Sequence, residues 1–163
     1  MQPNLPTIIL RHKRENLKKC TLRSLESRED FRFFSYPITE LPPLENYVIL
    51  SFDAPPLTKE DAHKGLFLVD ATWRYAEKIE RVIAPTFPME KRSLPIHYRT
   101  AYPRRQEDCP DPVRGLASIE ALYIAYHILE RDADSLLENY YWKDEFLSIN
   151  SLTLNKKTVK ISF

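Results

Sequence analysis

The chain is short of glycine. Only Gly65 and Gly115 occur among its 163 residues, beside thirteen prolines. Walker-type loops and the Rossmann fingerprint need several glycines, because only glycine lets the backbone approach a phosphate closely. Both nucleotide-binding motifs are therefore excluded, and a nucleotide-like ligand would have to be held in another way.

Cysteine is equally scarce, and long apolar runs are absent. Cys20 and Cys109 are too few for a disulfide framework or a four-cysteine zinc site. The four histidines show no metal-ligand spacing with one another or with the cysteines. No run of 18 apolar residues occurs, and the short apolar piece near the start precedes the basic residues, the reverse of a secretory signal. We expect a reduced, cytoplasmic protein with no metal and no membrane partner.

The remaining composition is that of a globular protein, with 43% hydrophobic and 29% charged residues. The length favours one domain over residues 1–163. Segments rich in β-branched and aromatic residues predict strands over 7–11, 31–36, 47–52 and 66–69, with a further strand over 94–98. Apolar spacing of three to four residues predicts helices from Trp73 to Ile83 and over 116–131, with shorter ones over 57–63 and 134–141. Strands that alternate with helices predict an α/β fold with a mostly parallel sheet.

One strand exit carries unusual side chains. Residues 66–73, LFLVDATW, run from a buried strand into Asp70 and then into Trp73, which opens a helix. In open parallel sheets the ligand site lies outside the carboxyl ends of the strands. Asp70 is then either a helix cap, with Trp73 an ordinary core aromatic, or a proton acceptor beside an indole wall.

Two segments are strongly basic. Residues 11–23 hold six Lys or Arg against one Glu, and residues 91–105 hold five and no acid, with Tyr98 and Tyr102 among them. Charge alone slightly favours ordinary solvated surfaces, but the same pattern suits an RNA backbone with bases stacked on the tyrosines. Ser118 and Cys20 have no base partner in the sequence, so nucleophilic catalysis is not favoured.

Several motifs point to a known family. VDATW (69–73) resembles the D-x-T-W motif of the DTW-domain proteins, and four other segments resemble the related small-subunit rRNA aminocarboxypropyltransferases. These segments are KKCTLRSL (18–25), VILS (48–51), LASIEALYIA (116–125) and WKDEFLSIN (142–150). Phe52 stands where the rRNA enzymes usually have proline. The loop over 100–115 is longer and richer in arginine than theirs, and the cysteine-rich start of the tRNA enzymes is absent.

The resemblance implies a SPOUT-like fold, in which a C-terminal trefoil knot forms the S-adenosylmethionine pocket. The single domain would comprise a basic part over about 1–45, a cofactor-binding knotted part over about 46–150 and a short tail. Asp70 is the expected base. The expected cofactor-binding residues are Thr21, Leu50, Ser51, Trp73, Ala76, Leu94, Gly115, Leu116, Ala117 and Ser118.

The implied activity is transfer of the 3-amino-3-carboxypropyl group of S-adenosylmethionine to a uridine-type base in structured RNA, with release of methylthioadenosine. Ribosomal RNA is slightly favoured over tRNA, and we expect a monomer. The alternatives are a methyltransferase of the same fold and a non-enzymatic RNA-binding or ribosome-assembly factor. The expected RNA-binding residues are Lys13, Arg14, Lys18, Lys19, Arg23, Arg99, Arg104 and Arg105.

Overall fold

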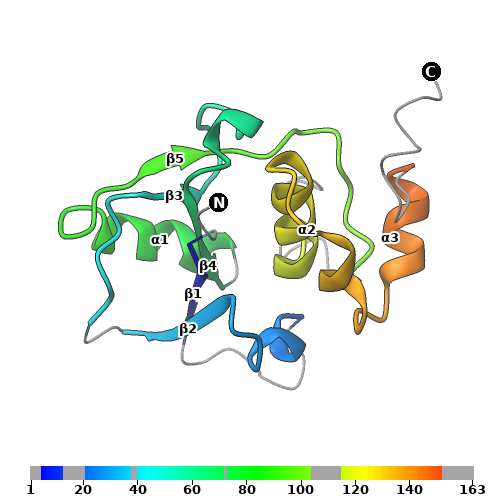
Figure 1. Ribbon diagram of the computed structural model, residues 1–163, viewed down its shortest axis with the longest axis horizontal. Coiled ribbons are helices and arrows are strands. Elements are labelled where there is room, and N and C mark those ends of the chain that lie inside the picture. Colours follow the sequence, from blue (N-terminus) through cyan, green and yellow to red (C-terminus); the bar gives the residue numbers. More distant parts are fainter. Residues whose placement is uncertain (1–4, 13–20, 38–39, 72, 104–114, 152–163) are drawn as a thin grey trace.

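Five parallel strands form the centre of the computed structural model (Figure 1). The structure describes residues 5–12, 21–37, 40–71, 73–103 and 115–151, and for residues 73 and 74 only the backbone. The strand order is β2-β1-β4-β3-β5. The strands are β1 (Thr7–His12), β2 (Phe31–Tyr36), β3 (Tyr47–Leu50), β4 (Gly65–Asp70) and β5 (Glu90–Arg92).

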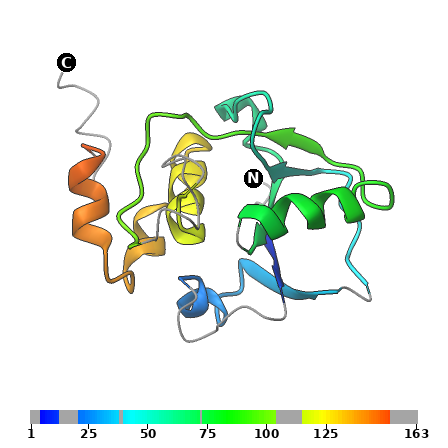
Figure 2. The ribbon, with the colours of Figure 1, turned by 180° about the vertical axis from the view of Figure 1, so that it is seen from behind.

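Helices pack on the two faces of this sheet. Because strand side chains alternate between faces, Ile8 and Leu10 pack with Ile79 and Ile83 of α1 (Trp73–Ile83), whereas Ile9 belongs to the core formed with α2 (Ser118–Ile128). The last helix, α3 (Lys143–Ile149), lies beyond α2 and away from the strands (Figures 1 and 2). β4 is buried along its whole length. The predicted α/β class with a parallel sheet is confirmed.

Some predicted elements differ from the structure. The strand expected over 94–98 is wrong, because the fifth strand is Glu90–Arg92. Its three charged residues lie at the sheet edge beside β3 alone, so no apolar pattern marks it. The helices expected over 57–63 and 134–141 are short 3₁₀ turns, η2 (Lys59–Asp61) and η3 (Asp134–Leu137).

One strand boundary shifts as well, and one helix was not predicted. β3 ends at Leu50, two residues earlier than expected, because the chain turns at Asp53 with a φ of 56°. The helix α3 was not predicted, since only Phe146 and Leu147 of its seven residues are buried and no apolar stripe develops. The tail from residue 152 lies outside the described residues. Within the described part of the chain, no helix is both long enough and apolar enough to span a membrane.

Candidate functional site

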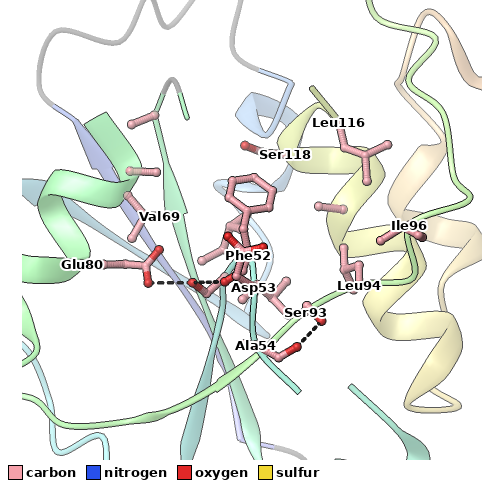
Figure 3. Close-up of a pocket in the computed structure, with 16 residues that line it drawn as sticks. Phe52, Asp53, Ala54, Val69, Glu80, Ser93, Leu94, Ile96, Leu116 and Ser118 are labelled. Carbon is pink, nitrogen blue, oxygen red and sulfur yellow. Dashed lines mark hydrogen bonds between the residues drawn. The ribbon is translucent and has the colours of Figure 1, made fainter. Parts of the chain in front are cut away.

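A cavity of about 530 Å³ opens where strands β3 and β4 end (Figure 3). Small-molecule sites typically measure roughly 300–1,000 Å³ and lie outside the carboxyl ends of parallel strands. The wall combines the strand ends with one side of α1, the chain after β5 and the start of α2. The described lining residues are Leu50, Ser51, Phe52, Asp53, Ala54, Leu68, Val69, Ala71, Ala76, Glu80, Ser93, Leu94, Ile96, Leu116, Ser118 and Ala121.

Asp70 connects three elements beside this cavity. It is 5% exposed, and its Oδ1 accepts a hydrogen bond of 2.6 Å from Ser118 Oγ at the start of α2. Its Oδ2 lies 3.4 Å from Nε of Arg11, the residue opposite it on β1. Arg11 also pairs with Glu26 at 2.7 Å and stacks over the Phe33 ring, 4.7 Å from its centroid. Asp70 is therefore a fixed carboxylate whose hydrogen-bonded neighbour, Ser118, reaches the cavity.

Glu80 is a second carboxylate at the cavity, contributed by α1. One helical turn separates it from Ala76, so both face the cavity. Glu80 Oε1 accepts a hydrogen bond of 2.9 Å from Ser51 Oγ and lies 3.9 Å from Nζ of Lys91. Burial raises the pKa of Glu80, while the Ser51 hydrogen bond and Lys91 act in the opposite direction. A carboxylate with a perturbed pKa in a cavity is a candidate functional group.

The floor of the cavity is a turn held against the end of β5. Ser51 N donates to the carbonyl of Arg92 at 2.9 Å, and Ser93 Oγ donates to the carbonyl of Ala54 at 2.7 Å. Between them Asp53 adopts the left-handed conformation, which Asp tolerates better than most residues. These bonds fix the side chains of residues 52–54, which face the space shown in Figure 3.

The α2 side of the cavity is fixed by Glu120, which is fully buried. Its Oε1 accepts from the backbone N–H of Ala117, the residue between Leu116 and Ser118 of the cavity wall. The backbone N–H of Ile119 donates to Thr21 Oγ1 at 3.2 Å. The start of α2 is therefore held by a side chain of its own and by one about 100 residues earlier in the sequence.

The structure brings most of the expected cofactor-binding residues together. Six of them line the cavity: Leu50, Ser51, Ala76, Leu94, Leu116 and Ser118. Gly115 and Ala117 are buried at the adjoining start of α2, and Thr21 contacts the same turn without lining the cavity. Trp73 begins α1, and its side chain lies outside the described part. The binding roles of all these residues stay predictions.

The expected RNA-binding residues fall mostly outside the described part of the chain. This holds for Lys13, Arg14, Lys18, Lys19, Arg104 and Arg105. Arg23 and Arg99 are described, and both are exposed. The backbone of Arg99 is held by the side chain of Asn150, the residue after α3, which accepts from the N–H of Arg99 at 2.7 Å and donates to its carbonyl at 2.8 Å.

Four features of the site were not found from the sequence. Arg11 could have been located by applying the strand-end rule to the first strand, since parallel strands end at one edge. Glu80 follows Ala76 by four residues, the spacing of one helix face. The hydrogen bond between Ser118 and Asp70 joins residues 48 apart in the sequence, and Glu120 accepts hydrogen bonds from loop residues 19 and 20 positions before it. No local sequence pattern predicts either of these contacts.

Comparison with known proteins gives an informative likeness to a solved structure. No family model matches the chain, and no curated protein matches its sequence. The solved structure described as the SAM-dependent rRNA:acp-transferase Tsr3 from Vulcanisaeta distributa superposes with a TM-score of 0.67 at 22% sequence identity. The match covers 93% of this chain and 82% of that one. The two chains share a fold. At this identity the likeness concerns the fold alone, and it extends over nearly all of the chain.

Proposed function

We propose that this protein transfers the 3-amino-3-carboxypropyl group of S-adenosylmethionine to a uridine-type base in ribosomal RNA, releasing methylthioadenosine. The observation that carries the proposal is the cavity itself. Six residues chosen from sequence motifs, in segments from 50 to 118, line one small-molecule-sized space at the carboxyl edge of the sheet. The shared fold with an enzyme described as an rRNA:acp-transferase supports the same reaction.

The chemistry needs alignment more than activation. A ring nitrogen of the base attacks the γ-carbon of the methionine portion, the bond from that carbon to sulfur breaks, and its electron pair stays on sulfur. The sulfonium thereby becomes a neutral thioether, and the proton of the ring nitrogen leaves to a base. Holding the two reactants in line can supply about 7–11 kcal/mol of the barrier. A positioned base typically adds a factor of roughly 10²–10⁴.

Asp70 and Ser118 together are the proposed proton acceptor. Ser118 Oγ lies in the cavity wall and donates to Asp70 Oδ1 at 2.6 Å. A proton taken from the substrate by the hydroxyl can therefore pass on to the buried carboxylate, which need not touch the substrate itself. The pairing of Arg11 with Asp70 and Glu26 holds the carboxylate in this orientation.

The RNA contacts belong to the same proposal. The target nitrogen takes part in base pairing, so the substrate base must be unpaired or flipped out. The exposed Arg23 and Arg99, together with the basic residues that lie outside the described part, are proposed to bind phosphates. We propose ribosomal RNA rather than tRNA as the substrate. The trefoil knot, the single-domain organisation, the monomeric state and the cytoplasmic location also stay predictions.

Two other functions fit the fold. A methyltransferase with the same cofactor would transfer the methyl group and leave S-adenosylhomocysteine. A non-enzymatic RNA-binding or assembly factor would bind RNA in a salt-dependent manner without affinity for the cofactor. The cavity favours a protein that binds a small molecule, because a binding factor needs no such space.

The test is a paired incubation of the protein with RNA from cells that lack the modification, supplied as total RNA and as small ribosomal subunits. One sample contains S-adenosylmethionine labelled in the methyl group, and the other contains cofactor labelled in the carboxyl carbon. We expect the carboxyl label in rRNA and methylthioadenosine in solution. Methyl label in RNA would instead assign a methyltransferase. The absence of both labels, with no cofactor binding by calorimetry, would leave the RNA-binding factor.

A further inference from the structure

The charged side chains among the described residues that line the cavity all have one sign. Among the described lining residues only Asp53 and Glu80 carry charge, and none is Lys, Arg or His. The rest of the lining is apolar apart from three serine hydroxyls. A cleft lined by one sign of charge, with apolar walls, raises the local concentration of ligands of the opposite sign. The cavity therefore favours a ligand that carries positive charge.

Glu80 is the charge best placed to act on such a ligand. Only 11% of its side chain is exposed, and in Figure 3 it extends from α1 toward the strand ends. Ser51 Oγ donates to it at 2.9 Å and fixes its direction. Lys91 lies 3.9 Å away and is 54% exposed, so much of its charge is screened by water. Desolvation is the largest cause of the raised pKa of Glu80, which means that the charged carboxylate lowers the stability of the folded protein.

The donor differs from both thioethers in the charge on its sulfur, and it differs from methylthioadenosine also by the aminocarboxypropyl group, which carries an α-ammonium and an α-carboxylate. The sulfur of S-adenosylmethionine is a sulfonium cation, whereas the sulfur of methylthioadenosine and of S-adenosylhomocysteine is neutral. We propose that Glu80 is a specificity-determining residue, whose carboxylate makes the cavity prefer the sulfonium donor to neutral thioethers. This inference rests on the proposed function. The same attraction ends when the group is transferred, so the neutral product leaves more easily than the donor.

The experiment compares affinities for three ligands by calorimetry, using the full-length protein. S-adenosylmethionine, S-adenosylhomocysteine and methylthioadenosine are each titrated into the wild type, Glu80→Gln and Glu77→Gln. Glutamine keeps the size of Glu80 and an oxygen that accepts from Ser51. Glu77 is the matched control, because it loses the same charge on the same helix but does not line the cavity. Its like charge raises the pKa of Glu80, so removing it favours the charged form of Glu80 and cannot weaken a cation bound there.

We expect Glu80→Gln to bind S-adenosylmethionine about tenfold more weakly, the effect of one partly buried charge pair. Its affinities for the two thioethers should change less than twofold, so the preference for the sulfonium falls about tenfold. Glu77→Gln should keep the wild-type preference within twofold. Equal thermal unfolding temperatures, or a higher one for Glu80→Gln, will show that the variant is folded.

Four results would overturn the inference. An equal loss for all three ligands would mean that Glu80 binds a part common to them, such as the ribose. A loss shared by S-adenosylmethionine and S-adenosylhomocysteine alone would mean that Glu80 pairs with their α-ammonium group. An unchanged preference in Glu80→Gln, with the wild type binding S-adenosylmethionine, would refute charge selection and leave the proposed function intact. A wild type that does not bind S-adenosylmethionine at all would refute both.

Discussion

Glu120 gives the sharpest test of how the cavity wall is built. Its side chain is fully buried and accepts four hydrogen bonds. Oε1 accepts from Thr100 Oγ1 at 2.7 Å and from Ala117 N at 2.8 Å, and Oε2 accepts from Ala101 N at 2.8 Å and from Tyr140 O–H at 2.9 Å. One carboxylate thereby joins the start of α2 to the loop before it and to the segment that leads into α3.

Glu120→Gln is the informative change, because it keeps the shape and replaces one acceptor oxygen with an amide donor. Whichever way the amide points, it faces one hydroxyl, which can turn and accept, and one backbone N–H, which cannot. Leaving that buried N–H unsatisfied costs about 1–3 kcal/mol, and weakening the remaining charge-assisted bonds costs about 1 more. We expect a loss of about 2–4 kcal/mol in the free energy of unfolding, out of the roughly 5–15 typical of a domain.

The assay is urea unfolding at equilibrium, with Tyr140→Phe as the matched control. That variant removes a single hydrogen bond to Glu120 and should cost about 1 kcal/mol. Because Glu120 holds the turn that carries Leu116 and Ser118, Glu120→Gln should also weaken cofactor binding, whereas Tyr140→Phe should leave it nearly unchanged. If Glu120→Gln costs no more than Tyr140→Phe, the four-bond description of this carboxylate is wrong.

Three further predictions concern the strand ends and the sheet. Asp70→Asn should lower the rate of transfer by a factor of roughly 10²–10⁴, and Ser118→Ala should lower it by less. Both variants should fold nearly normally. Single-turnover rates that match the wild type would refute proton transfer through Ser118 to Asp70. Glu80→Gln should unfold at a higher urea concentration than the wild type at pH 7 but not at pH 4. The raised pKa of Glu80 gives stability that is present below its ordinary value near 4.5 and is lost as the pH rises through the folded value. A stability difference independent of pH would contradict that assignment. Gly65→Ala should destabilise by about 1–3 kcal/mol, because the added Cβ would lie 2.4–2.7 Å from the buried ring of Tyr47; Tyr47→Leu should remove most of that penalty in a double-mutant cycle.

Much of the fold could be predicted because its central strands are buried on both faces. Such strands are continuous apolar runs, and β1, β3 and β4 lie in the middle of the sheet order. The edge strand β5 could not be found in this way, since Glu90, Lys91 and Arg92 pair with one neighbour and need no apolar side chains. Its place is set by tertiary contacts, among them the bonds that tie Ser51 and Leu57 to its end.

The candidate site also has a part that the sequence could predict and a part that it could not. Asp70 could be located because a rule of parallel sheets applies to any residue at a strand exit. Its partner Ser118 lies 48 residues away, and Arg11 lies 59 residues away on the other side. These contacts depend on the strand order, which follows from how the chain crosses between strands and from no local pattern. The sequence therefore identified the carboxylate, and the fold was needed to find what holds it.

Three acids lie in or beside the cavity wall, Asp70 and Glu120 buried and Glu80 with 11% of its side chain exposed, and they differ in how far the protein compensates each one. Glu120 accepts four hydrogen bonds, and Asp70 is bonded to Ser118 and paired with Arg11. Among the described residues, Glu80 accepts one hydrogen bond, from Ser51, and has a largely exposed lysine at 3.9 Å. A buried charge is costly unless it is paired, so the least compensated acid should be the one that a ligand completes. Glu80 is also the one of the three whose side chain lines the cavity. Within the described part of the chain, Glu80 thus has the fewest partners of the three acids, and its side chain also lines the cavity. These two separate observations both support the proposed cationic ligand at Glu80.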